Sequence, residues 1–429
     1  MQFVADFHIH SPYSRATSPA MELETLNRYA QIKGIAVIGT GDFTHPAWFS
    51  NLQKKLEPAE NGLFKLRQKY KSVSDKDVPS ICRSDVRFIL SAEVSCIYSK
   101  NGRTRKVHNL LIVPSFDEVA KINAALSKIG NLKADGRPIL GLDSKVLLSI
   151  ALNSSPDVLF IPAHAWTPHF AVLGSNSGFN SLEECFEDLT PHIYAIETGL
   201  SSDPSMNWRL SALDRVALIS NSDAHSPAKL AREANIFNTE LSYKNIYEAI
   251  KSRDKSKFIG TIEYFPEEGK YHLDGHRDCK QRMTPSETKQ NNGLCLKCGG
   301  KVTVGVMHRV EDLADRKEGK IPHGAIPFKR LIPLQEIIAE VYDAGVNTKK
   351  VLNMHSNLIS ALGNELSILQ NLPVKEIGEA STPIIAEGIL RVRKGNVKIA
   401  PGYDGEYGTI EIFDQEEREK AQKGQIKLL

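Results

Sequence analysis

The segment Asp6-Phe7-His8-Ile9-His10 constrains this chain more than any other feature of its sequence. It follows directly on a short apolar stretch, residues 3–5. Residues i and i+2 of a β-strand face the same side, so a strand would point His8 and His10 together, with Asp6 in line behind them. Two imidazoles that converge on one point are suited to hold a metal ion. Taken alone, the pair fits two histidines satisfied by hydrogen bonds at a strand end equally well.

The same pattern recurs at six further places, where an apolar run ends in metal-ligating residues or contains one. They are Asp42 and His45 after residues 35–38, Glu93 after 88–90, His108 within 107–113, His164 after 158–162, Glu197 after 194–196, and Asp223 and His225 after 216–220. Apolar strands separated by helical stretches indicate a parallel sheet that is buried on both faces. In a parallel barrel the C-terminal strand ends open onto one face, so the sequence predicts one shared metal site there.

In type and order, these motifs resemble those of the PHP (polymerase and histidinol phosphatase) superfamily. The resemblance covers roughly residues 1–262 and implies an α/β fold, a distorted seven-stranded β/α barrel that holds two or three divalent metals for phosphoester hydrolysis. A closer resemblance, over nearly the whole chain, is to the endonuclease Q family, which nicks DNA on the 5′ side of deaminated bases. It rests on residues 41–46, 162–168, 197–203 and 221–227.

The PHP resemblance also implies a ligand set for each metal. The first metal would take His8, His10, Glu93 and Asp223, the second Glu93, His108 and His164, and the third His225 with Asp42 or His45. Of these, His8, His10, Glu93 and Asp223 are expected to carry the catalysis. Imidazole and carboxylate ligands suit zinc, manganese or iron rather than calcium, and magnesium is kept as a fourth candidate.

The chain departs from the PHP pattern at the third metal. Many PHP proteins have Asp-His directly in the second motif, whereas Phe43 follows Asp42 here and the histidine comes at position 45. Ser14 and Arg15 stand where some relatives supply a further histidine. A two-metal site therefore remains an alternative.

The resemblance implies a DNA repair endonuclease whose partner is double-stranded DNA with a deaminated nucleotide (hypoxanthine, uracil or xanthine) or an abasic one. Hydrolysis would leave a 3′-hydroxyl and a 5′-phosphate. A small-molecule phosphatase of the histidinol-phosphatase kind is the main alternative, but it gives no reason for the segments after residue 262. A non-enzymatic nucleic-acid-binding module with a decayed site is the third reading.

Action on a damaged base requires a pocket that accepts the extruded base. Residues near the metal motifs that could form it are Tyr13, Phe43, Trp166, Glu197, Trp208 and Arg209. For any single aromatic ring among them, packing in the core is the alternative.

The six cysteines form two groups. Cys82, Cys96 and Cys185 are scattered, which is typical of inert thiols in a cytosolic chain. His276, Cys279, Cys295 and Cys298 are spaced as in a zinc ribbon, so they predict one structural zinc ion. His272 competes with His276 for the fourth ligand position, and a Cys-x-x-Cys redox pair is the alternative to zinc.

The domain plan places the phosphoesterase barrel at residues 1–262, the zinc-binding module at 263–308, and a mainly helical, DNA-contacting domain with short strands at 309–429. Apolar spacing predicts helices over 334–342 and 351–366. Residues 388–393 and 397–405 are expected to form short strands and turns, with 401–408 as a tight turn or a DNA-contacting loop.

Charge and composition set few limits. With 429 residues and a net charge of +3, the chain is too long for one core and too weakly basic to argue DNA binding by charge alone. Two basic clusters, residues 100–106 and 391–398, are candidates for phosphate contact or for solvated faces. We expect no membrane span and a cytoplasmic, nucleoid-associated protein. A sliding clamp stays open as a partner, because residues 425–429 do not form a clear clamp-binding peptide.

Overall fold

A computed structural model describes residues 1–414, 416 and 417 of the chain, so the expected position of a clamp-binding peptide lies outside the described residues. The fold is mixed α/β, as predicted. None of the described helices combines the length and the apolarity that crossing a membrane requires.

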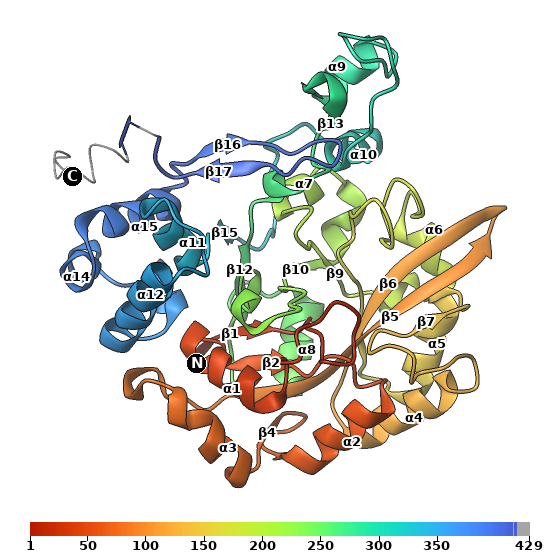
Figure 1. Ribbon diagram of the computed structural model, residues 1–429. Helices are drawn as coiled ribbons and strands as arrows, with labels where there is room; N and C mark the ends of the chain where they lie inside the picture. The colour runs from red at the N-terminus through yellow and green to blue at the C-terminus, as the bar shows by residue number, and fades with distance from the viewer. Residues whose placement is uncertain (415, 418–429) are drawn as a thin grey trace.

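A large mixed sheet forms the centre of the molecule (Figure 1). Its main path runs in the order β15-β12-β11-β1-β2-β5-β4-β3, β6 pairs with β5, and β8 pairs with β6. The bounds are β1 Gln2–Asp6, β2 Val37–Gly39, β3 Leu56–Pro58, β4 Phe64–Leu66, β5 Arg87–Lys100, β6 Arg103–Val113, β8 Leu159–Pro162, β11 Ala234–Asn238, β12 Phe258–Glu263 and β15 Phe328–Arg330. A separate parallel pair is formed by β9 (Ala195–Glu197) and β10 (Ala217–Ile219).

The sheet is not the parallel one that the apolar runs suggest. Strands β1, β2 and β5 are parallel neighbours, but β5–β6, β6–β8, β1–β11 and β11–β12 are antiparallel. The reason at β5–β6 is the turn at Asn101 and Gly102, which have φ angles of 52° and 71°. Two consecutive positive φ angles characterise the tight turns that join antiparallel strands, and Asn-Gly is the preferred pair for them.

Helices cover the sheet and lead the chain from one strand to the next (Figure 1). The longer ones within residues 1–262 are α1 Leu23–Lys33, α2 Pro46–Lys55, α4 Phe116–Leu126, α5 Ser144–Ser154 and α8 Tyr243–Ser252. Each buries an apolar side against the sheet; in α1, for example, Leu23, Leu26 and Ala30 are fully buried. This packing holds the strand ends that carry the candidate ligands in fixed positions.

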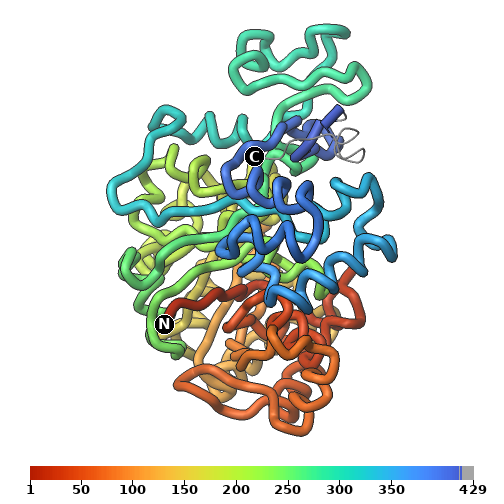
Figure 2. Tube along the Cα trace, turned by 90° about the vertical axis from the view of Figure 1, so that its left-hand side faces the viewer, coloured from red at the N-terminus to blue at the C-terminus, as the bar shows by residue number. Residues whose placement is uncertain are grey.

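A small module projects from the rest of the molecule in both views (Figures 1 and 2). It contains β13 Asp274–His276, β14 Gln281–Met283 and α9 Pro285–Gln290, and α10 (Val306–Leu313) leads back from it. The chain then returns to the main sheet, where β15 pairs in parallel with β12. The region after residue 308 therefore contributes a strand to the same sheet as β1.

The C-terminal region is mainly helical, as expected, and packs beside α1 (Figure 1). Its elements are α11 Leu334–Val341, α12 Lys349–Leu362, α13 Glu365–Gln370, α14 Val374–Ala380, α15 Pro383–Lys394, and the hairpin of β16 Lys398–Ala400 and β17 Thr409–Glu411. The expected strand at 388–393 is wrong, because these residues belong to α15. Thr382 caps that helix by accepting a hydrogen bond from the Ile385 amide, Pro383 occupies its first turn, and Gly395 ends it with a φ of 70°.

Candidate metal-dependent active site

His8 and His10 follow β1 and are completely buried. Nδ1 of His8 lies 3.0 Å from each carboxylate oxygen of Glu197, and Nδ1 of His10 lies 3.0 Å from Oδ1 of Asp42. A carboxylate on one ring nitrogen fixes the tautomer and leaves the other nitrogen as a metal ligand. Nε2 of His8 has no hydrogen-bond partner among the described residues, so it is available for that role.

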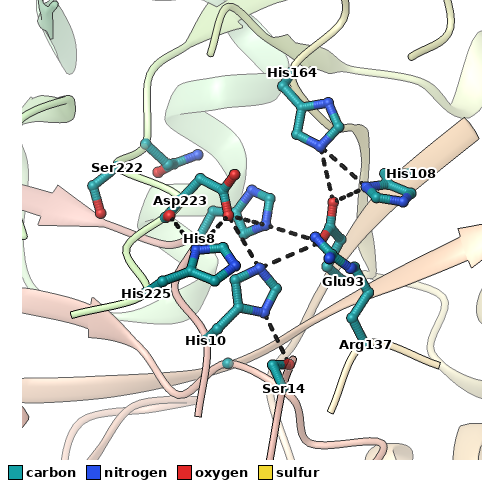
Figure 3. Close-up of polar contacts among 12 residues, drawn as sticks. His8, His10, Ser14, Glu93, His108, Arg137, His164, Ser222, Asp223 and His225 are labelled. Atoms are coloured by element: carbon teal, nitrogen blue, oxygen red, sulfur yellow. Dashed lines mark hydrogen bonds and ion pairs between the residues drawn. The ribbon is translucent and has the colours of Figure 1, made fainter. Parts of the chain in front are cut away.

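Glu93 occupies the middle of the site (Figure 3). Its Oε1 is 2.7 Å from Nδ1 of His108 and 3.0 Å from Nε2 of His164. Its Oε2 is 3.4 Å from Nε2 of His10 and 3.6 Å from Nε2 of His8. One carboxylate therefore faces two groups of imidazoles, which is the position of a ligand that bridges two metals.

Two sets of three ligand atoms are close enough to surround an ion. His8, His10 and Asp223 form one set, and Glu93, His108 and His164 form the other; within each set the ligand atoms lie within 4.8 Å of one another. Asp223 approaches His10 with Oδ1 3.0 Å from Nε2. Imidazole and carboxylate donors at these distances, with a buried imidazole nitrogen left unpaired, fit divalent transition metals.

Electrostatics favour cation binding at both sets. Burial would raise the pKa of Glu93, but His108 and His8 hold it well below its usual range. Burial would lower the pKa of His8 and of His10, but the carboxylates of Glu197 and Asp42, respectively, contribute to raising them well above the ordinary value. The site thus keeps the Glu93 carboxylate ionised and attracts protons to His8 and His10, and a divalent cation would take the place of those protons.

Three residues of the site have strained backbone conformations. Asp42, His164 and Asp223 have φ angles of 46°, 30° and 46°. Residues other than glycine adopt this left-handed region at a cost of about 1–3 kcal/mol each, and such strain concentrates at functional sites. Each of the three follows a strand of the sheet or of the β9–β10 pair, so the turn that ends the strand also aims the side chain.

Comparison with known proteins identifies relatives of this chain. The crystal structure of the lesion-specific endonuclease PfuEndoQ from Pyrococcus furiosus matches with a TM-score of 0.83 and 32% identity, over 97% of this chain and 96% of that one. The chain belongs to the endonuclease Q family. A structure of endonuclease Q with a 27-mer duplex substrate that has an abasic lesion at the active site matches with a TM-score of 0.81 and 32% identity, over 97% and 98% of the two chains.

Two further relatives of this endonuclease Q family member are uncharacterised. YqxK of Bacillus subtilis is 27% identical over 423 residues, which is 95% of this chain and 98% of that protein. MJ0043 of Methanocaldococcus jannaschii is 36% identical over 247 residues, and this match covers 55% of the chain but only 30% of that relative's length. The family described as the MJ0043 C-terminal domain matches residues 333–396.

The residues expected at a third metal lie outside both sets of ligand atoms. Asp42 contacts Nδ1 of His10 and accepts hydrogen bonds from Ser11 and Ser14. It therefore orients the candidate ligand His10 and does not itself occupy a ligand position. The His225 ring lies 4.4 Å from that of His10, and its Nδ1 is 2.9 Å from the carbonyl oxygen of Asp223. His45 stacks on Tyr13 at 4.2 Å between ring centroids. A third metal in this endonuclease Q family member stays a prediction.

The residues expected in a base pocket differ in what they can reach. The rings of Phe43 and Trp166 are 0% and 1% exposed, so neither offers a face to a base in this structure. Glu197 is buried against His8, and Trp208 packs edge-on against Phe328. Arg209 forms an ion pair with Glu311. Tyr13 is 41% exposed and is the outer ring of the stack on His45.

His276, Cys279, Cys295 and Cys298 meet in the projecting module, with one ligand atom from each within 4.8 Å of the others. His276 ends β13, Cys279 follows it, and the last two cysteines come after α9. The competing residue, His272, is buried elsewhere, and its Nδ1 has no partner among the described residues. The structure therefore brings His276 to the three thiols, and four such donors fit a tetrahedral zinc ion.

The two basic clusters are largely engaged within the protein. Arg105 is buried and donates to the Gly178 carbonyl, and Lys100 pairs with Glu187. In the second cluster, Arg391 pairs with Glu417, and Arg393 donates to the carbonyls of Leu369 and Ile368. These contacts make phosphate binding by either cluster as a whole unfavourable.

One cation of the site was not apparent from the sequence. Arg137 donates from Nη1 to Oε2 of Glu93 at 3.0 Å. It lies in the irregular segment between α4 and β7 (Ile139–Leu140), which has neither an apolar period nor a metal-ligand motif. No sequence signal marks it.

Proposed function

We propose that this chain is a metal-dependent endonuclease that nicks DNA at a lesion. The cut would fall on the 5′ side of a deaminated base (hypoxanthine, uracil or xanthine) or of an abasic site, and would leave a 3′-hydroxyl and a 5′-phosphate. Membership of the endonuclease Q family supports this proposal, since one relative is described as a lesion-specific endonuclease and another was solved with an abasic duplex.

The observation that carries the proposal is the position of Glu93 between the two sets of ligand atoms. His8, His10, Asp223 and Glu93 would hold one metal, and Glu93, His108 and His164 a second. Two divalent metals held in this way can activate a water and stabilise the leaving oxygen of a phosphodiester. A third metal at His225 would require Asp42 to leave His10 or His45 to leave its stack on Tyr13.

The chain's own residues supply orientation and charge. Glu197 and Asp42 fix the imidazoles of His8 and His10 through their Nδ1 atoms. Glu197 is itself held by the side-chain amide of Asn221, at 2.9 Å, and by the backbone amide of His164, at 2.8 Å. This network joins the two ligand sets, so a displacement of the side chains in one set would also displace those in the other. No nucleophilic side chain is needed.

The remaining assignments belong to the same proposal. The region 1–262 would be a PHP-type phosphoesterase domain, 263–308 a module held by one structural zinc, and 309–429 a C-terminal domain that contacts the duplex. Tyr13 is the side chain we expect to meet the lesion or its neighbouring base, because its ring is exposed beside the site. Stacking on such a ring contributes about 1–3 kcal/mol per base.

A nicking assay tests the proposal. Duplexes with one hypoxanthine, one uracil, one abasic site or no lesion are incubated with manganese or magnesium, and the products are sized. We expect a nick immediately 5′ of the lesion and none in the undamaged duplex. Absence of a nick in every duplex, with manganese, magnesium and zinc all tried, would overturn the proposal, and phosphate release from histidinol phosphate would then favour a small-molecule phosphatase.

A further inference from the structure

The segment that carries Arg137 is fixed firmly over the site. The amide of Gly136 donates to the Tyr13 carbonyl at 2.9 Å, and the Thr44 hydroxyl donates to the Gly136 carbonyl at 3.1 Å. A Cβ atom at Gly136 would lie 2.3 Å from Oδ2 of Asp42 and 2.4 Å from the Ser14 hydroxyl. Only glycine permits this approach, so the backbone beside Arg137 is held against the residues that orient His10.

The guanidinium of Arg137 reaches the gap between the two ligand sets. Figure 3 shows it at Glu93, with His10, His8 and Asp223 on one side and His108 and His164 on the other. Its Nη1 donates to Glu93, and among the described residues Glu93 is its one acceptor. A guanidinium has five N–H donors in a planar fork, so most of them are left for another acceptor.

The side chain of Arg137 is more exposed to solvent than that of Glu93, which it contacts. Its side chain is 24% exposed, whereas that of Glu93 is 0% exposed. The group is therefore the cation that a molecule entering the site from solvent meets beside Glu93.

An ion pair with Glu93 alone does not account for this placement. When Glu93 binds metal cations, its charge is already compensated, and a guanidinium beside two divalent ions is repelled unless an anion lies next to it. A phosphodiester at the metals supplies that anion. Planar, charge-assisted hydrogen bonds between arginine and phosphate oxygens are strong and directional.

We infer that Arg137 donates hydrogen bonds to a non-bridging oxygen of the scissile phosphate and so acts as a catalytic residue. This inference rests on the proposed nuclease function. One side of the fork stays on Glu93 while the other holds the phosphate, which fixes the distance between the phosphorus and the bridging carboxylate. The same contact stabilises the charge that grows on the phosphate oxygens during cleavage.

The test combines variants of the protein with a change in the DNA. Arg137→Ala, Arg137→Lys and the exposed control Arg67→Ala are compared with the wild type on a duplex with a stable abasic-site analogue. The scissile linkage is either a phosphate or a methylphosphonate, which lacks the negative charge and one acceptor oxygen. Affinity is measured by fluorescence anisotropy without added divalent metal and without a chelator, so that the projecting module keeps its zinc, and nicking by single-turnover kinetics with manganese.

We expect the methylphosphonate to weaken binding to the wild type and to Arg67→Ala by about tenfold, and binding to Arg137→Ala by less than about twofold. Nicking of the ordinary duplex should fall by roughly 10²–10³-fold in Arg137→Ala, with an intermediate rate in Arg137→Lys, which keeps the charge but not the fork. Equal melting temperatures would exclude misfolding as the cause.

The outcomes separate this inference from the proposed function. If the wild type nicks the duplex but the methylphosphonate weakens Arg137→Ala as much as the wild type, the phosphate contact is refuted and the nuclease proposal stands. If the wild type binds the duplex without nicking it and only Arg137→Ala is insensitive to the methylphosphonate, the contact stands without the nuclease. A wild type that neither nicks nor binds refutes both.

Discussion

Both carboxylate oxygens of Glu197 lie 3.0 Å from Nδ1 of His8. The pair is completely buried, and it directs Nε2 of His8 toward Glu93 and Asp223. Glu197 ends β9 while His8 follows β1, so the β9–β10 pair determines how a ligand on another strand is oriented. Glu197, which the PHP resemblance left out of every ligand set, is in this way part of the candidate metal site.

The first prediction follows from this contact. Glu197→Gln keeps the shape of the side chain but removes its charge, so it weakens the orientation and basicity of His8. We expect the affinity for manganese or zinc at the active site to fall by about 10–100-fold. Titration calorimetry of protein freed of metal at the active site, but not in the projecting module, measures it, with the exposed Glu376→Gln as a control. An affinity equal to that of the wild type would contradict the role assigned to Glu197.

Asp223→Asn separates cleavage from binding. The substitution removes a carboxylate whose Oδ1 is 3.0 Å from His10 and 3.7 Å from His8, but it leaves the rest of the surface unchanged. We expect nicking to fall by 10³-fold or more, on the order of the loss of a central catalytic group, and affinity for abasic duplex to change little. Full nicking activity in this variant would show that the metal assignment is wrong.

A buried acid should make stability depend on pH. Glu263 is completely buried, and burial, together with the nearby charge of Asp203, raises its pKa to about 8. The unfolded chain releases this proton near pH 4.5. Between these values only the folded state binds it, so the free energy of unfolding falls as pH rises, by about 1.4 kcal/mol per pH unit from this group.

Glu263→Gln removes that titrating proton. The free energy of unfolding should therefore depend less on pH between these two values. We expect the free energy of unfolding of the wild type to fall more between pH 5 and pH 8 than that of the variant. Urea unfolding of both proteins at the two pH values measures the difference. Parallel profiles for the two proteins would mean that Glu263 is ionised in the folded state.

Sequence periodicity predicted most of the side chains that the structure brings together at the candidate site, but not everything around them. His8, His10 and Asp223 could be predicted because strand ends and a period of two residues fix where such side chains point. Glu93 was expected at the end of a strand but lies inside β5. The Asn101-Gly102 pair carried the signal for the antiparallel hairpin, and Thr382-Pro383 with Gly395 carried the signals for α15; both were outweighed by the apolar runs beside them. The burial of Phe43 and Trp166 could not be read from the sequence, because nearness to a motif does not give a side chain's direction. Arg137 lies in an irregular segment whose position depends on contacts with Tyr13 and Thr44, far away in the sequence.

Cys295→Ser should act on the projecting module rather than on the catalytic site. Cys295 is 3% exposed and belongs to the cluster of one imidazole and three thiols. A module of this size has too small a core to fold without its metal. We expect the variant to lose one zinc ion per chain and affinity for the lesion duplex, while Cys185→Ser, outside the cluster, retains both. Zinc analysis and anisotropy measure these changes, and an unchanged zinc content would exclude the cluster as a metal site.

The contact between Lys33 and Glu365 joins the first helix of the sheet region to the C-terminal helices. Nζ of Lys33 lies 2.9 and 2.8 Å from the two carboxylate oxygens, and both side chains are at most 5% exposed. The carboxylate also lies 3.0 Å from Nε2 of His355 and accepts a hydrogen bond from the backbone amide of Leu334. The three partners named here, Lys33, Leu334 and His355, belong to α1, α11 and α12, and Glu365 belongs to α13. The contacts of Glu365 therefore hold these four helices together.

Lys33→Met leaves the charge of Glu365 buried, with His355 and the Leu334 amide as its remaining partners among the described residues. We expect the variant to lose about 3–5 kcal/mol of stability, because removing one member of a buried pair leaves the other uncompensated. The double variant Lys33→Met, Glu365→Leu should recover most of this loss, since no buried charge then remains. Lys375→Met is the matched control, because Lys375 pairs with Glu379 on an exposed face of α14, where such pairs contribute little. Urea unfolding and limited proteolysis of the C-terminal helices measure the effect, and a double variant as unstable as Lys33→Met would show that packing, rather than the buried charge, holds this interface.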